Sequence, residues 1–169
     1  MTETLSALTT QSDSRAAGIE LGNQIRQAFH GAAADAVIVF ASAQPDYDVL
    51  LGALAETSGT RTIVGSSSAG EFTHGSRGEG YVSALALRSQ SLHFSVGLGR
   101  GISRDPVAAA RQVVASFQGL AAAGSATAMR PMPYRSALVM TDALAGHSDA
   151  VVEELTLATM QDVSYALVR

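Results

Sequence analysis

The sequence contains no cysteine and no lysine, and each absence excludes a class of chemistry. Without cysteine there can be no disulfide, no thiolate nucleophile and no cysteine-ligated metal. Without lysine there can be no Schiff-base mechanism and no Walker-type phosphate loop. No stretch approaches the roughly 20 apolar residues of a membrane helix, and the polar segment Met1–Ser14 does not have the pattern of a secretory signal. We therefore expect a cytoplasmic protein without a membrane partner.

Charged residues are also scarce. They make up 15% of the chain, below the usual value of about 25%, whereas apolar residues make up 47%. This composition suits one domain with a sizeable core. The formal charge is −4 and the eleven arginines are scattered, so the chain lacks the basic stripe that binds nucleic acid. The low charge content predicts apolar surface that another domain or subunit covers.

Hydrophobic periodicity predicts alternating helices and strands. The predicted helices are residues 14–30, 45–58, 105–117 and 148–160, and the predicted strands are residues 36–41, 62–65, 81–87, 92–98 and 137–140, with a loop at 119–130. The first two strands and the helix between them form a βαβ unit, and residues 81–87 and 92–98 form an antiparallel hairpin. We expect a single α/β domain with a mixed sheet over residues 14–160, a loosely ordered segment 1–13 and an atypical tail 161–169.

Polar side chains directly follow three of the predicted strands, where open α/β sheets bind ligands. They are Ser42, the segment Ser66–Glu71 and the pair Thr141-Asp142. The small residues of Ser66–Gly70 admit a ligand close to the backbone, whose N–H groups suit an anionic group, while Glu71 or Asp142 suits an α-amino group. The predicted ligand-binding residues are Ser66, Ser67, Ser68, Gly70, Glu71, Thr141 and Asp142. A tight turn without a ligand is the alternative interpretation of the serine segment.

A serine hydrolase is a second alternative, with Ser67 or Ser68 as the nucleophile. The G-x-S-x-G nucleophile elbow is one residue short at both serines, although Asp142 and His147 follow in the right order. A glycine-rich segment and a hairpin follow the serines, where an elbow requires a helix. We therefore assign no catalytic residue. The histidines do not have the spacing of a metal site, and His74 and His147 lie nearest the predicted ligand site.

Five segments together resemble the FIST N-terminal domain. Their order and spacing match that domain from about Ala33 to Met160, and they are Val37–Ala41, Pro45–Leu51, Ile63–Glu71, Gly78–Ser83 and Leu138–Gly146. The resemblance implies a sensory domain of a bacterial signal-transduction protein that binds a small ligand, such as an amino acid or its derivative, and that is not an enzyme. In the wider family the position of Ser66 is often cysteine.

The same resemblance implies the partners of this chain. They are a C-terminal FIST domain or a signalling protein, namely a kinase, a cyclic-nucleotide enzyme or a chemotaxis module. Some family members are described as haem-binding nitric oxide sensors, which makes haem-linked sensing a further alternative. No residue pattern selects an axial ligand, so the cofactor stays unknown. Because Gln161–Arg169 does not resemble the family's continuation, we expect a truncated chain.

Overall fold

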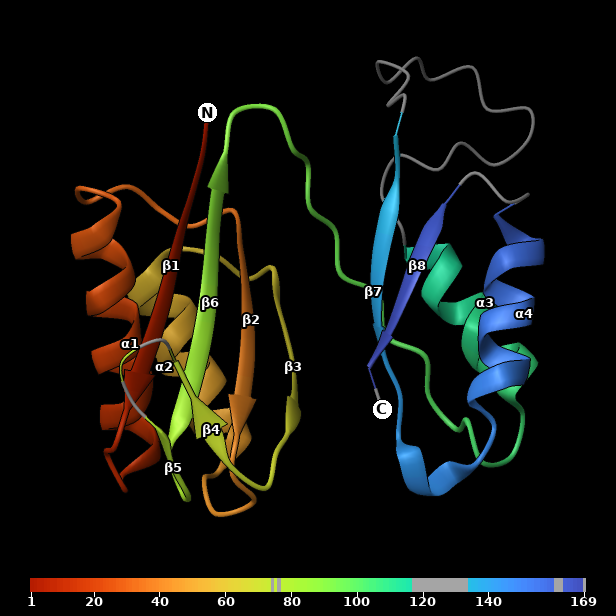
Figure 1. Cartoon of the computed structure of the whole chain (residues 1–169), viewed down its shortest axis with the longest axis horizontal. Coiled ribbons are helices and arrows are strands. Elements are labelled where there is room, and N and C mark those ends of the chain that lie inside the picture. The colour runs from red at the N-terminus through yellow and green to blue at the C-terminus, as the bar shows by residue number, and fades with distance from the viewer. Residues whose placement is uncertain (74, 76, 117–133, 160–162, 169) are drawn as a thin grey trace. The chain divides into compact units, whose positions relative to one another are not determined.

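The computed structural model describes all residues except 74, 76, 117–133, 160–162 and 169. The chain divides into two compact units, Met1–Phe94 and Ser95–Arg169, which we call the N-terminal unit and the C-terminal unit (Figure 1). Each unit has its own strands, helices and hydrophobic cluster. The α/β class predicted from the sequence is confirmed.

The N-terminal unit is built on a four-stranded mixed sheet. Its elements are β1 (Thr2–Thr9), α1 (Ser14–Ala28), β2 (Ala36–Ala41), α2 (Tyr47–Ser58), β3 (Ile63–Ser67), β4 (Glu71–Phe72), β5 (Arg77–Gly78) and β6 (Val82–Ser89). The spatial order in the sheet is β1-β6-β2-β3. Strand β2 pairs in parallel with β3 and antiparallel with β6, and β6 pairs antiparallel with β1. The predicted βαβ unit is therefore confirmed as β2, α2 and β3.

Both helices of this unit pack on one face of the sheet (Figure 1). Alternate residues of each strand point toward them, as the period-2 geometry of a strand requires. The buried core residues are Ala7, Val37, Val39, Ala41, Val82, Ala84 and Ala86 from the strands and Ala17, Leu21, Ile25, Leu50 and Leu54 from the helices. Each helix begins at an aspartate N-cap: Asp13 accepts from the Ala16 amide, and Asp46 accepts from the Asp48 and Val49 amides.

The two helices approach each other at two glycines of α1. A Cβ atom on Gly18 would lie 2.4 Å from the carbonyl oxygen of Leu50, and one on Gly22 would lie 2.4 Å from the Cβ of Thr57. The glycines are four residues apart and so share one side of α1. Their missing side chains let the backbones of α1 and α2 come close together.

The opposite face of the sheet carries apolar side chains that the helices of this unit do not cover. Ile38, Phe40, Val64 and Leu87 are half-buried, and Leu85 is 39% exposed. The register places Ile38 beside both Val64 and Leu85. These side chains form an apolar face on the side of the sheet away from α1 and α2.

The C-terminal unit pairs two parallel strands with two helices. It contains α3 (Pro106–Ser116), β7 (Ser136–Met140), a 3-10 turn η1 (Ala143–Ala145), α4 (Ser148–Ala158) and β8 (Ser164–Val168). Ala110, Val151 and Leu155 form its buried cluster, against which Ile102, Val113, Val114 and Val139 pack. The predicted loop at 119–130 lies outside the described residues. Among the helices of the described part, none has the length and apolar character needed to cross a membrane.

The prediction of a loosely ordered N-terminus is wrong for Thr2–Thr9. These residues form β1, which pairs along its whole length with β6. Thr9 is buried, and its hydroxyl donates to Glu20 of α1 over 2.8 Å. The sequence does not indicate this edge strand clearly, because it is rich in hydroxyl side chains and only alternate residues, such as Leu5 and Ala7, pack against the core.

The predicted hairpin between residues 81–87 and 92–98 is also wrong in its second strand. The first strand exists as β6, but residues 92–98 are not in a strand. Strand β6 already has β1 on one edge and β2 on the other, so it has no free edge for a third partner. An antiparallel hairpin is present instead between β4 and β5, where Glu71 pairs with Gly78 and Phe72 with Arg77.

The helix contact yields a stability prediction with a matched control. We expect Gly18→Ala to lower the free energy of unfolding by about 1–3 kcal/mol, because the new Cβ collides with the backbone of α2. Gly52→Ala should raise it by about 0.5–1 kcal/mol, because Gly52 lies in α2 with nothing within 4 Å of its Cβ position. Urea denaturation of both variants measures the difference. Equal midpoints for the two variants would contradict the close contact.

Candidate functional site

The carboxyl ends of β2 and β3 lie together because the strands are parallel. Ala41 at the end of β2 pairs with Ser67 at the end of β3, and the Ser68 amide donates to the Ala41 carbonyl over 2.8 Å. We call this end of the sheet the carboxyl edge and residues Ser66–Gly70 the serine loop. The structure thus brings five of the predicted site residues, Ser66 to Glu71 without Ala69, to the edge at which open α/β sheets bind ligands.

Glu71 is a buried carboxylate at the base of the serine loop. The residue is 3% exposed. The Ser68 hydroxyl donates to its Oε1 over 2.5 Å, and the Tyr81 amide donates to its Oε2 over 3.0 Å. Two such bonds offset much of the cost of burying a charge. Glu71 therefore holds together the serine loop, β4 and the start of β6, and it fixes the position of the Ser68 hydroxyl.

The outer part of the serine loop faces solvent. Ser66 and Ser67 are exposed, and the Ser66 hydroxyl donates to the Ser67 carbonyl over 3.1 Å. Gly70 is also exposed, and a Cβ atom there would meet only the carbonyl oxygen of Gly78, at 3.8 Å. The loop therefore presents two hydroxyls and open backbone to an incoming molecule.

Ser42 forms the neighbouring part of the edge, directly after β2. Its amide donates to the Tyr81 carbonyl over 3.3 Å, and its carbonyl accepts from the Tyr47 hydroxyl over 2.8 Å. The residue is buried. Sequence reasoning noted Ser42 as a polar residue at a strand end but did not place it among the ligand-binding residues. Its position after a buried apolar strand was the signal that could have placed it there.

Thr141 and Asp142 lie in the C-terminal unit, after β7. Asp142 is exposed, and its side chain accepts from the Leu144 amide over 2.9 Å and so caps η1. The Thr141 hydroxyl lies 3.2 Å from the Ser148 hydroxyl at the start of α4. Asp142 thus caps η1, and Thr141 is linked to the first residue of α4. Their contact with a ligand stays a prediction.

The local structure around the serines does not match a nucleophile elbow. The chain passes from β3 through the serine loop into β4, whereas an elbow turns from a strand into a helix. The Ser68 hydroxyl donates to a carboxylate and not to a histidine. His147 is exposed in the C-terminal unit, and His74 lies outside the described residues. Within the described residues there is no group of three acidic or histidine side chains that could hold a metal ion.

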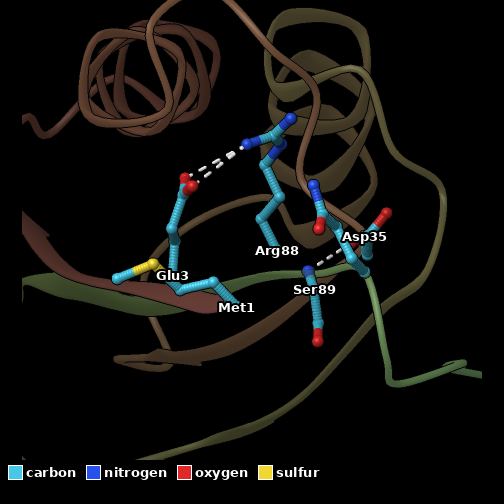
Figure 2. Close-up of a pocket in the computed structure, with 6 residues that line it drawn as sticks. Met1, Glu3, Asp35, Arg88 and Ser89 are labelled. Carbon is cyan, nitrogen blue, oxygen red and sulfur yellow. Dashed lines mark hydrogen bonds and ion pairs between the residues drawn. The ribbon is translucent and has the colours of Figure 1, made fainter.

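A small polar hollow lies at the opposite end of the sheet, beside the start of β2 (Figure 2). Its volume is about 150 Å³, and its walls are Met1, Glu3, Asp35, Arg88, Ser89 and Gln90. Arg88 contacts both carboxylate oxygens of Glu3 at 3.2 Å, and the Ser89 amide donates to Asp35 over 2.7 Å. The ion pair is part-exposed, so it adds only about 0–1 kcal/mol. These contacts link the start of β1, the start of β2 and the end of β6, at the end of the sheet opposite the serine loop.

The Glu71 network yields a second prediction. Glu71→Ala should lower the free energy of unfolding by about 1–3 kcal/mol, because it leaves the Ser68 hydroxyl and the Tyr81 amide without their acceptor. Glu71→Gln should cost less, since its amide oxygen can accept from Tyr81 and its NH₂ group can donate to Ser68. Glu79→Ala, at an exposed position of the same region, is the control and should change little. Chemical denaturation measures all three variants. An unchanged free energy of unfolding for Glu71→Ala would contradict the network.

A model of the FIST N domain matches residues 35–166. The match begins just before β2, includes the serine loop, Thr141 and Asp142, and ends within β8. It therefore includes six residues of the tail that we predicted to be atypical. A search of curated proteins found no match to this sequence.

Proposed function

The chain belongs to the FIST N domain family, a family of sensory domains of signal-transduction proteins, and from this premise we propose that its carboxyl edge binds the small molecule that the domain senses. The observation that carries the proposal is the parallel pairing of β2 with β3. This pairing places the serine loop at the end of the sheet where α/β proteins bind ligands. The exposed hydroxyls of Ser66 and Ser67 and the open backbone at Gly70 supply the polar contacts.

We propose an amino acid or a close derivative as the ligand. Such a molecule carries an anionic and a cationic group, and hydroxyls are suited to both because they donate and accept hydrogen bonds. Backbone N–H groups of the serine loop other than that of Ser68, which donates to the Ala41 carbonyl, would bind the carboxylate. The buried Glu71 carboxylate makes its surroundings favourable for the ammonium group, with the Ser68 hydroxyl as an acceptor. Thr141 and Asp142 are proposed as further ligand contacts on the C-terminal unit.

The signalling role requires a partner that receives the ligand's signal. We propose a C-terminal FIST domain, a kinase, a cyclic-nucleotide enzyme or a chemotaxis module, acting with this chain in the bacterial cytoplasm. The apolar sheet face around Leu85 supports the presence of a partner, because apolar side chains that the helices of the unit leave uncovered are typical of interaction sites. The proposal includes no catalysis by this chain.

A thermal-shift screen against the twenty L-amino acids tests the proposed ligand. A ligand that binds only the folded state, at about 100 times its Kd, adds about 2.7 kcal/mol of stability. We expect at least one amino acid to raise the melting temperature of the wild-type chain. The double substitution Ser66→Ala with Ser67→Ala should reduce that rise, because it removes the exposed hydroxyls.

The control is Ser91→Ala, which removes an exposed hydroxyl near the opposite end of the sheet. It should leave the ligand-induced rise unchanged. If no amino acid raises the melting temperature of a chain that melts cooperatively, the proposed ligand class is wrong. If the control and the double substitution reduce the rise equally, binding takes place elsewhere than the serine loop.

A further inference from the structure

Ser42 has a buried hydroxyl that is bonded to none of the described residues. The residue is 8% exposed. Its amide and its carbonyl are both used, by Tyr81 and by Tyr47, so its backbone is fixed and only the hydroxyl is spare. Buried polar groups are almost always hydrogen-bonded in folded proteins. A spare hydroxyl on a fixed backbone therefore requires a physical reason.

The position of Ser42 supplies that reason. It is the first residue after β2, and the preceding residue, Ala41, accepts a bond from the Ser68 amide of the serine loop. Tyr81 joins Ser42 to the Glu71 carboxylate, because its carbonyl accepts from the Ser42 amide and its own amide donates to Glu71. The spare hydroxyl thus belongs to the carboxyl edge. Ser42 is linked to the buried Glu71 carboxylate through Tyr81.

We propose that the Ser42 hydroxyl is a direct contact for the polar head of an α-amino acid. This inference rests on the proposed function of the carboxyl edge and adds a residue and a binding chemistry to it. A hydroxyl can donate to the carboxylate and accept from the ammonium group of the same zwitterion. Both groups are attached to one carbon atom of the ligand, so a single hydroxyl can reach both. The nearby Glu71 carboxylate favours the ammonium group over a second anion.

Ser58 provides a matched control within the same chain. Its hydroxyl is also buried and without a partner among the described residues. It lies at the end of α2, where the Ser58 amide would be 3.0 Å from a Cβ on Gly22 of α1. The Ser58 carbonyl accepts from the amide of Ala34, just before the start of β2, so Ser58 lies at the opposite end of β2 from the carboxyl edge and a ligand bound there cannot reach it. Removal of its hydroxyl should leave ligand binding unchanged.

The first measurement is chemical denaturation of Ser42→Ala, Ser58→Ala and the wild type without added ligand. If the Ser42 hydroxyl is unbonded in the free protein, its removal should leave the midpoint unchanged or raise it, because a buried unpaired group destabilises the fold. A clear fall of the Ser42→Ala midpoint below those of Ser58→Ala and the wild type would overturn the proposal. That result would show that the hydroxyl has a structural bond, to a buried water for example.

The second measurement is calorimetric titration with the L-amino acid that most raises the wild-type melting temperature, and with its methyl ester and N-acetyl derivative. We expect Ser42→Ala to weaken binding of the amino acid about tenfold or more, as for a lost hydrogen bond to a charged group. Both derivatives should bind the wild type more weakly than the parent amino acid, and Ser58→Ala should bind like the wild type.

The outcomes separate this inference from the function on which it rests. If the wild type binds an amino acid and Ser42→Ala binds it equally well, the role of Ser42 is wrong while the proposed function stands. If the methyl ester and the N-acetyl derivative bind as tightly as the parent, the hydroxyl does not contact the zwitterionic head. If the wild type binds none of the twenty amino acids, the proposed ligand class and the role of Ser42 both fail.

Discussion

The parallel pairing of β2 with β3 is the constraint on which the rest of the N-terminal unit depends. Parallel neighbours cannot be joined by a tight turn, so the chain must cross over through a helix, which here is α2. That helix has to share one face of the sheet with α1. Gly18 and Gly22 make this possible, since any larger side chain would push the helices apart. The same pairing fixes where β2 and β3 end, and hence where the serine loop lies.

The carboxyl edge combines one fully bonded polar group with one that is unbonded. The Glu71 carboxylate receives the Ser68 hydroxyl and the Tyr81 amide, so its burial supports the local fold. The hydroxyl of Ser42, a residue whose backbone is linked to Glu71 through Tyr81, has no such partner among the described residues. Natural proteins accept such local costs at functional sites, where a ligand supplies the missing partner. The contrast between the two groups is the observation from which we propose that Ser42 contacts the ligand.

The sequence predicted best those elements whose signal is local. Strand β2 was predicted at its observed bounds because AVIVFA is a continuous run of apolar residues, and α2 ends near Gly59, whose left-handed conformation stops a helix. Strand β1 was missed because its pairing with β6 joins residues about 80 positions apart, which periodicity does not detect. Residues 92–98 alternate like a strand, yet the edges of β6 are already occupied by β1 and β2.

The serine loop was predicted from its place directly after a strand. The sequence could not predict the bond from the Tyr81 amide to Glu71 or the absence of a partner for the Ser42 hydroxyl, because both depend on which residues the fold brings together.

The central claim is that a small ligand binds at the carboxyl edge and not at the hollow beside the start of β2. A two-dimensional ¹H–¹⁵N NMR titration of the whole chain with an amino acid that stabilises it tests this most directly. We predict that the amide signals of Ser42, Ser66–Gly70 and Tyr81 shift, while those of Asp35 and Arg88–Gln90 at the opposite end of the sheet stay in place. Shifts confined to Asp35 and Arg88–Gln90 would contradict the claim and would place the ligand in the hollow shown in Figure 2.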